Sequence, residues 1–347
     1  MKPLSRSSVW RCATVALAVV ALAPIAALAA PQYRIEPVPA GDDVVPITAS
    51  GVNHKGEVVG QALIKQGRNI ASYAYRDGST VQIGLPGDHL TAINRRADSA
   101  GDTTSNAAWW NKSGLLHNLG TRMSCQGASH AVDMNDDRLL AGWISCRDGS
   151  THAFVAHHGV VTDLPTLGGK GADARAINNA GQVVGDAATD KKGQFGPFFH
   201  AYRWQDGTIT DLGTLGGDQS DAWAIADNGH VVGSAQDASG AWLPYLHDGT
   251  QMTALPDCRD GFYTSPMAIN SKDQIVGVFG NGRRNEVFLM QYQHCHRLSD
   301  LLDASGADWE LEMVDGINNA GQIVGSGQYQ GQARAFIATP IATSIAP

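Results

Sequence analysis

The chain has 347 residues, with 25 basic and 33 acidic side chains, a net charge of −8, 40 glycines and only 17% charged residues. This acidic balance, without a basic stripe, excludes a protein that binds nucleic acid through bulk electrostatics. Many glycines and few charges favour a turn-rich β protein over a helical one.

The first 29 residues have the pattern of a cleaved signal peptide. Three basic residues precede an apolar run at 13–28, and Ala27-Leu28-Ala29 places small residues before a cut. A membrane anchor is the alternative, but the run is short for a spanning helix and contains Pro24. Removal of the three basic residues takes the net charge from −8 to −11. We therefore expect export to the periplasm or the extracellular space, with no later segment that spans a membrane.

A ten-residue segment recurs seven times along the remaining chain. Ala-Ile-Asn-Asn-Ala-Gly-Gln-Val-Val-Gly at 176–185 returns as Gly-Ile-Asn-Asn-Ala-Gly-Gln-Ile-Val-Gly at 316–325, and five further copies are looser. The third residue of each copy marks the register, and successive marks lie 41, 41, 43, 48, 44 and 48 residues apart. These register marks are Asn53, Asn94, Asn135, Asn178, Ala226, Asn270 and Asn318. Such even spacing predicts a repeat architecture.

Each copy contains four short apolar stretches separated by turn residues. In the fourth copy they lie at 173–178, 182–187, 200–204 and 208–215. Asp206-Gly207 joins the last two, and Asp-Gly between β-rich runs indicates a tight hairpin. The asparagine that opens each first turn can cap its own backbone. Four strands in each of seven copies predict an all-β, seven-bladed β-propeller.

The first stretch of each copy is predicted to lie nearest the propeller axis. Ala174 and Ala176 alternate on one face of this stretch, and Ala222 and Ala224 take the same positions one copy later. Small side chains are required where blades converge at native packing density. The opposite face varies between copies, and functional differences are therefore expected there.

The seventh copy lacks a fourth strand, because only 313–317, 322–326 and 334–338 fit the pattern. Residues 33–38 supply a spare strand before the first copy, and its pairing into the last blade would close the ring and cover both open edges. A β-solenoid is the alternative, but it does not explain a missing last strand matched by a spare first one. The predicted organisation is a leader at 1–29, a propeller at 30–340 and a flexible tail at 341–347.

Two short motifs also recur within the copies. HAF at 152–154 matches HAYRW at 200–204, and DLPTLGG at 163–169 matches DLGTLGG at 211–217. Together with the INNAGQVVG-type runs, these motifs resemble those of the HAF-repeat family of bacterial extracellular proteins. The resemblance covers essentially the whole mature chain and is weak in the second copy, where Ala97 replaces the turn glycine. It implies export and supplies no catalytic residues.

Motifs for phosphate binding and nucleophilic catalysis are better explained by the repeats. Gly213, Gly216 and Gly217 lie between two predicted strands, whereas a phosphate loop must open onto a helix. Ser220 has no partnering histidine at a repeated offset and no glycine after it, so a nucleophile elbow is excluded. No catalytic residue and no cofactor are predicted.

Metal sites are not predicted either. The recurrent turns offer too few carboxylates for calcium. The densest histidine clusters, at 157–158 and 294–296, do not supply three convergent ligands. His152 and His200 open matching strands, and their repetition favours a structural hydrogen bond to the neighbouring turn.

Four cysteines remain after the leader, namely Cys125, Cys146, Cys258 and Cys295. An even number in an exported chain suggests disulfides. Cys125 and Cys146 are expected on one face of the same blade, which makes their pairing credible. Cys258 and Cys295 are expected on opposite faces and pair only by elimination, because a bridge requires Cα atoms within about 7 Å.

A binding surface is predicted on the face shared by the loops between blades and the loops between second and third strands, which we call the blade-joining face. Phe195, Phe198, Phe199 and Trp242 are expected there in long loops. Exposed aromatic side chains on a rigid scaffold suit sugar or protein recognition. The alternative is that they pack beneath their own loops.

Arg175, Trp223 and Asp315 are further candidate binding residues, near the inner ends of first strands. The predicted function is non-catalytic binding of an unknown protein or glycan partner by an exported monomer. The alternative is a propeller hydrolase or lyase with a site at the axial mouth, where His130 and Asp221 are also expected. Three or more ionisable groups in one axial pocket would favour the enzyme.

Overall fold

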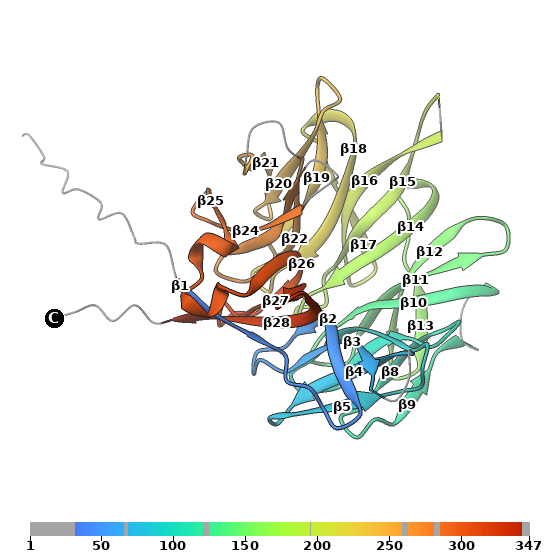
Figure 1. Cartoon of the computed structure of the whole chain (residues 1–347). Coiled ribbons are helices and arrows are strands. Elements are labelled where there is room, and N and C mark those ends of the chain that lie inside the picture. Colours follow the sequence, from blue (N-terminus) through green and yellow to red (C-terminus); the bar gives the residue numbers. More distant parts are fainter. Residues whose placement is uncertain are drawn as a thin grey trace, which may run out of the picture. The chain divides into compact units, whose positions relative to one another are not determined.

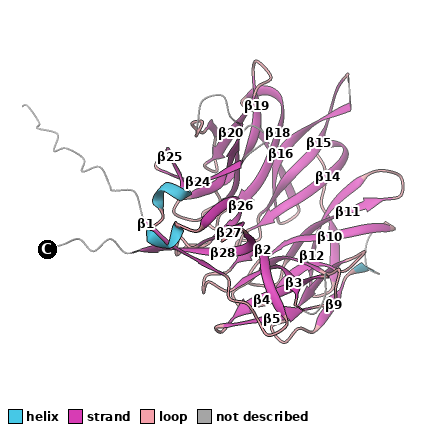
Figure 2. Ribbon diagram, in the orientation of Figure 1, coloured by secondary structure: helices cyan, strands magenta, loops and turns pink. Residues whose placement is uncertain are grey.

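The computed structural model describes residues 32–65, 69–120, 125–194, 196–258, 263–280 and 285–341. The predicted leader, residues 342–347 of the predicted tail, and Phe195 lie outside these ranges. Within them, the strands form seven four-stranded antiparallel sheets, which dominate Figure 2. The prediction of an all-β, seven-bladed propeller is therefore confirmed, and the solenoid alternative is wrong. No helix of the described residues is long and apolar enough to cross a membrane.

Six blades each consist of four strands that are consecutive in the sequence, and their colours in Figure 1 follow the chain from blue to orange. Blade one contains β2 (Val44–Val52), β3 (Val58–Ile64), β4 (Ile70–Arg76) and β5 (Ser79–Ile83). Blade two contains β6 (His89–Ile93), β7 (Ser99–Asp102), β8 (Ala107–Trp110) and β9 (Leu116–Asn118). Blade three contains β10 (Gly127–Met134), β11 (Leu140–Cys146), β12 (Thr151–His157) and β13 (Val160–Asp163). Blade four contains β14 (Gly168–Ile177), β15 (Val183–Gly193), β16 (Gly196–Gln205) and β17 (Thr208–Gly213). Blade five contains β18 (Gly216–Ile225), β19 (Val231–Asp237), β20 (Trp242–His247) and β21 (Met252–Ala254). Blade six contains β22 (Tyr263–Ile269), β23 (Ile275–Gly280), β24 (Asn285–Gln291) and β25 (His294–Arg297).

Blade seven combines strands from both ends of the described chain. Its members, in spatial order, are β1 (Gln32–Pro37), β28 (Gln332–Ile341), β27 (Ile323–Tyr329) and β26 (Trp309–Ile317). β1 pairs antiparallel with β28, with Tyr33 opposite Pro340, and Figure 1 shows the blue strand beside the red one. β1 occupies the outer edge of this sheet, where Pro37 is tolerated because an edge position does not need every backbone N–H. Two short 3-10 helices, η2 (Leu298–Leu301) and η3 (Ala304–Gly306), precede β26.

Every innermost strand contains a β-bulge three residues before its register mark. The pairing with the second strand of the blade shifts at this position in all seven sheets. The bulged residues, which we call the bulge ring, are Ser50, Thr91, Val132, Arg175, Trp223, Met267 and Asp315. A glycine of the Val-Val-Gly motif lies opposite each bulge; a Cβ at Gly185, for example, would clash with the carbonyl oxygen of Asp173. The repeated glycine therefore permits a close backbone approach.

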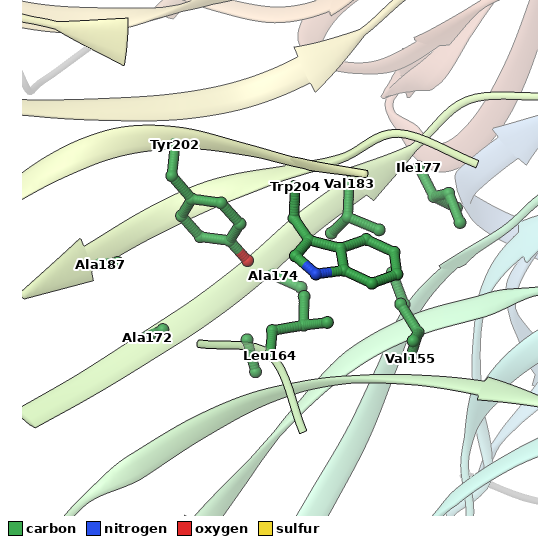
Figure 3. Close-up of a cluster of buried hydrophobic side chains, with 11 residues drawn as sticks. Val155, Leu164, Ala172, Ala174, Ile177, Val183, Ala187, Tyr202 and Trp204 are labelled. Carbon is green, nitrogen blue, oxygen red and sulfur yellow. The ribbon is translucent and has the colours of Figure 1, made fainter. Parts of the chain in front are cut away.

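Apolar side chains of neighbouring blades fill the space between the sheets. Figure 3 shows Tyr202 and Trp204 of β16 and Ala174 of β14 packed against Val155 and Leu164 of blade three. These five residues are at most 9% exposed. Because burial of a Val or Leu side chain contributes about 1.5–3 kcal/mol, each blade is stabilised mainly by its neighbours. Ala174 has the small side chain that the sequence predicts for the innermost strand.

The asparagines at the register marks connect the blades into a ring around the axis. We call this set the asparagine ring, and it comprises Asn53, Asn94, Asn135, Asn178, Asn270 and Asn318. Each side-chain oxygen accepts N–H groups two and four residues ahead, at 2.9–3.1 Å. The prediction that these side chains cap their own turns is therefore confirmed.

The side-chain nitrogen of each of these asparagines makes a second contact that the sequence analysis missed. It donates to the backbone oxygen at the register mark of the next blade, at 2.8–3.3 Å. The bond from Asn318 to the oxygen of Asn53 joins the last copy to the first. One side chain thus fixes a turn and its neighbour together.

The fifth copy breaks this ring because Ala226 has no amide to donate. Its backbone oxygen still accepts from Asn178, at 3.0 Å. The link to blade six is made instead by Asn228 and His230, whose side-chain nitrogens lie 3.0 and 2.8 Å from Asp273 Oδ1. The contact between blades five and six therefore uses different chemistry from the other junctions.

Ser220 is a structural residue, as its repeat position suggests. It is fully buried, and its hydroxyl donates to the Gly213 oxygen at 2.6 Å while accepting the Ala201 N–H at 2.8 Å. Ser129 accepts the Ala107 N–H in the same way two copies earlier. These hydroxyls bind the innermost strand of one blade to the preceding blade.

Both disulfides are present, Cys125–Cys146 with Cα atoms 5.8 Å apart and Cys258–Cys295 with Cα atoms 5.3 Å apart. Cys258 and Cys295 were expected on opposite faces and therefore poorly placed for a bridge, but the structure brings them close enough to form one. β25 has only four residues, which corresponds to about 13 Å at the rise of a strand, so its ends are not well separated. The segment that carries Cys258 also packs between blades five and six, beside Leu255 and Cys295.

The aromatic residues of the blade-joining face lie on strands and not in the long loops that were expected. β15 and β16 extend together as a hairpin, with Lys192 opposite Pro197, so Phe198 and Phe199 belong to β16. Trp242 is the first residue of β20. Continuous backbone pairing therefore fixes the positions of these rings.

The asparagine ring gives a paired prediction for stability. Ala226→Asn should supply the missing donor and turn cap, and raise the free energy of unfolding by about 0.5–1.5 kcal/mol. Asn318→Ala should lower it by about 1–3 kcal/mol, because it leaves buried backbone groups without partners. Urea denaturation of both variants and the parent protein measures the difference. A destabilising Ala226→Asn would contradict the role assigned to the ring.

Candidate functional site

The bulge ring supplies the variable side chains of the innermost strands. All seven of its residues are partly exposed, whereas their neighbours one residue earlier are mostly buried. β-Bulges re-aim side chains and are common beside functional sites. In blades four and five the ring carries Arg175 and Trp223, and the guanidinium carbon lies 5.0 Å from the centre of a Trp223 ring. This cation–π contact joins blades four and five at the bulge-ring position, where the side chains of the two copies differ.

Arg175 is also held by two carboxylates of its own blade. Its Nε lies 3.5 Å from Asp186 Oδ1 and its NH2 nitrogen 3.9 Å from Asp173 Oδ2. Asp173 on β14 pairs directly with Asp186 on β15, so the sheet register places both acids beside the same cation. Asp221 of β18 occupies the position in blade five that Asp173 has in blade four.

A cavity of about 350 Å³ opens beside these groups on the blade-joining face. We call it the acidic pocket, and its defining residues are Lys170, Asp173, Asp186, Phe199, Asp221 and Trp242. Trp242 is 47% exposed and Asp186 is 8% exposed, so an accessible aromatic ring lies near a largely buried carboxyl. Pockets with a few polar groups among aromatic walls are typical binding sites.

Burial raises the pKa of all three carboxyls in the acidic pocket. The pKa of Asp186 rises to about 6, chiefly because of its burial, and Arg175 opposes the shift. The pKa values of Asp173 and Asp221 are raised by burial as well, and Arg175 again opposes the change. A single guanidinium therefore does not compensate the desolvation of three neighbouring acids.

Two fully buried tyrosine hydroxyls lie close to these acids without a hydrogen-bond partner in the described residues. They belong to Tyr202 and Tyr245, which are both 0% exposed. Burial raises the pKa of each, and nearby carboxylates raise it further: Asp186 and Asp173 for Tyr202, and Asp221 and Asp186 for Tyr245. Buried polar atoms normally have partners, so these two hydroxyls and the three acids form an unusual cluster between blades four and five, which we call the polar sector.

At the third-strand position that faces the repeated glycine, each tyrosine lies near an axial carboxylate. The residues that face the Val-Val-Gly glycines are Tyr73, Ala108, Phe154, Tyr202, Tyr245, Phe288 and Phe336. Burial chiefly raises the pKa of the third tyrosine, Tyr73, and the nearby carboxylate of Asp315 raises it further. The polar sector therefore has a second, smaller part around blades seven and one.

Most of the predicted binding residues are brought together. Phe199 and Trp242 line the acidic pocket, and Arg175 and Trp223 form the contact behind it. Phe198 does not contribute, because its ring lies against the position that a side chain of Gly193 would occupy on the same hairpin. For this residue, the alternative of packing against its own segment describes the structure.

Asp315 stands apart from the acidic pocket on the innermost strand of blade seven. Among the described residues it has no ion pair or hydrogen bond, and burial raises its pKa to about 7. The sequence analysis missed Asp173, Asp186 and Lys170. Asp173 is recognisable in the sequence, because it shares the repeat position of Asp221. Asp186 lies on a second strand, outside the first-strand positions that the repeats mark as variable.

The conspicuous histidines take part in structural pairs. His200 Nδ1 lies 2.9 Å from Asp211 Oδ2, and His152 Nδ1 lies 3.5 Å from Asp163 Oδ2. In both copies the histidine of the HAF-type motif therefore pairs with the aspartate of the DLGTLGG-type motif and links the third strand to the fourth. His130 Nδ1 lies 2.7 Å from Asp102 Oδ2 of the preceding blade. Among the described residues, no three His, Cys, Asp or Glu side chains are placed to hold a metal ion.

A second cavity, of about 340 Å³, lies at the axis on the opposite face. It is lined by the register-mark residue of every copy and by the residues directly before and after it. Val52, Ile93 and Ile177 are among the residues before the marks, which give the cavity an apolar base. The asparagine amides in its wall are already used within the asparagine ring. The residues after the marks add further polar side chains to the lining, namely His54, Arg95, Asp136, Asn179, Asp227, Ser271 and Asn319.

No protein-family model and no curated protein sequence matches the chain. Solved structures of β-propellers do match. The β-propeller domain of the Trilobed protease from Pyrococcus furiosus has 10% identity and a TM-score of 0.56, covering 86% of this chain and 94% of that one. A structure described as YCF48 bound to D1 peptide has 9% identity and a TM-score of 0.54, covering 92% and 99%.

A puromycin-hydrolyzing peptidase from Mycobacterium tuberculosis also matches, with 11% identity and a TM-score of 0.53. The match covers 87% of this chain but only 52% of the peptidase, so this chain corresponds to about half of that enzyme. At these identities the likeness shows the fold alone, and the chain is a β-propeller.

Asp315 generates a prediction for pH dependence. Its pKa is about 7 in the folded protein, against about 3.9 for an unfolded aspartate. Between these values the folded state binds more protons than the unfolded state, so the free energy of unfolding should fall as the pH rises from 4 to 8. Asp315→Asn should reduce this fall by about 1–3 kcal/mol. Urea denaturation at both pH values tests it, with the exposed Asp218→Asn as a control that should leave the fall unchanged.

Proposed function

We propose that the protein is an exported, non-catalytic repeat protein that binds a protein or glycan partner through its blade-joining face. Two disulfides support export, because such bridges form and persist in oxidising compartments outside the cytosol. The HAF-type and DLGTLGG-type motifs support membership of the HAF-repeat family, which we propose on the same footing. The precise compartment proposed is the periplasm or the extracellular space.

The acidic pocket carries the proposal of binding. It combines an exposed tryptophan, a second aromatic ring and three carboxyls on strands that backbone pairing holds rigid. Rigid aromatic anchors bind with little loss of side-chain entropy, and the polar groups around them provide orientation. The asymmetry of the site also supports the proposal. The set of pocket residues that blade four contributes, and the set that blade five contributes, are not repeated in the other described blades.

Trp242→Ala should weaken partner binding at least tenfold, because it removes the most accessible aromatic anchor of the pocket. Partners captured from glycan arrays and from extracellular protein extracts provide the ligands, and titration calorimetry measures their affinity. Tyr292→Ala is the matched control, since Tyr292 is 69% exposed in the turn between β24 and β25, away from the pocket. Equal affinity for Trp242→Ala and the parent protein would remove this surface from the proposal.

A hydrolase or lyase remains the second candidate, because three ionisable acids converge in one pocket. Asp186, with a pKa of about 6, could donate a proton near neutral pH, and Asp221 could accept one. Incubation of each captured glycan or peptide with the protein, followed by mass spectrometry of products, tests this activity. Products that are absent from the Asp221→Asn and Asp186→Asn variants would establish the enzyme; intact ligand with the parent protein would eliminate it.

A further inference from the structure

We propose that the acidic pocket binds the cationic side chain of a lysine or arginine that an extended segment of a partner protein presents. This inference rests on the proposed binding function of the blade-joining face and specifies its ligand. It follows from the unmet hydrogen-bonding capacity of the pocket, its uncompensated negative charge and its depth.

The acidic pocket contains acceptors that no described residue satisfies. The carboxylate of Asp221 lines the cavity without a hydrogen bond or ion pair to the described residues. The Oδ1 atoms of Asp173 and Asp186, which also line the cavity, are buried without a hydrogen-bond partner in the described residues. Because carboxylates accept but do not donate, the complementary ligand must carry several N–H or O–H donors.

The charge of the pocket favours a cationic donor over a neutral one. Arg175 forms ion pairs with Asp173 and Asp186, at 3.9 and 3.5 Å, but not with Asp221, on which its charge acts only at longer range. Lys170 is exposed at the rim and does not enter the buried cluster. Burial raises the pKa of each of the three acids, which is the response of carboxyls that lack a sufficient counter-charge. A second cation would restore that balance.

The shape of the pocket favours a slender side chain. Asp186 is only 8% exposed, whereas Trp242 is 47% exposed and lines the same cavity with Phe199. A lysine places its ammonium at the end of a flexible four-carbon stem, which can lie along aromatic walls while its charge reaches the buried acids. An amino sugar carries its nitrogen directly on a broad ring. The aspartates are also not placed to hold a metal ion among the described residues.

The test uses the full chain and a pair of short Gly/Ser peptides with one central lysine, free in one peptide and Nε-acetylated in the other. Titration calorimetry at pH 7.5 measures both affinities, and a chitosan oligosaccharide and a neutral oligosaccharide provide the sugar arms. The same titrations are repeated with Asp221→Asn, whose side chain is partly exposed, and with Asp186→Asn. Asp42→Asn is the matched control, because it removes an exposed carboxyl just before β2 that does not line the pocket. Circular dichroism verifies that each variant is folded.

The free-lysine peptide should bind at least tenfold more tightly than the acetylated peptide. Asp221→Asn should reduce its affinity at least tenfold, and Asp42→Asn should leave it unchanged. Equal affinity for the two peptides, or unchanged affinity in the folded Asp221→Asn variant, would overturn the inference. Binding of either oligosaccharide alone, in a manner that depends on Trp242, would overturn it too but leave the proposed function intact. If every pocket variant binds the partner as tightly as the parent protein does, both the further inference and the proposed binding surface are wrong.

Discussion

The hydrogen bonds of the asparagine ring are the constraint on which the rest of the propeller depends. Seven strands converge at the axis, where backbone groups are buried and each needs a partner. An asparagine at the register mark satisfies two N–H groups of its own turn and donates to the next blade, as Asn178 does to the oxygen of Ala226. Because six of the seven copies make this bond, the turns at successive register marks are linked to one another around the axis.

The site follows from that arrangement. The bulge ring gives every copy one variable side chain at the same repeat position, and two adjacent copies place Arg175 and Trp223 there in contact with each other. The same two copies carry Asp173 and Asp221 two residues earlier. The repeated scaffold thus carries an asymmetric pocket, because these four side chains lie at positions that the glycines and register-mark residues of the scaffold do not occupy.

The polar sector is a departure from the packing that stabilises the other blades. Phenylalanine on the third strand would fill the space of Tyr202 without burying a hydroxyl, as Phe154 does one blade earlier. An unsatisfied buried hydroxyl costs about 1–3 kcal/mol, and three desolvated carboxyls add to that cost. Such local destabilisation, surrounded by regular repeats, is typical of sites that are completed by a ligand.

The sequence alone determined the seven blades, the order of their four strands and the self-capping of the asparagine turns, because each depends on spacing and on residues close in the chain. It did not show that β15 and β16 extend through the expected long loop. It also selected Arg175 and Trp223, since variation at a repeat position is visible without coordinates. Only the tertiary structure decided the Asn318–Asn53 bond, the Cys258–Cys295 bridge and the meeting of Asp186 with Arg175. These contacts depend on how blades rotate about the axis and on which face of a second strand turns inward, and a linear repeat pattern carries neither quantity.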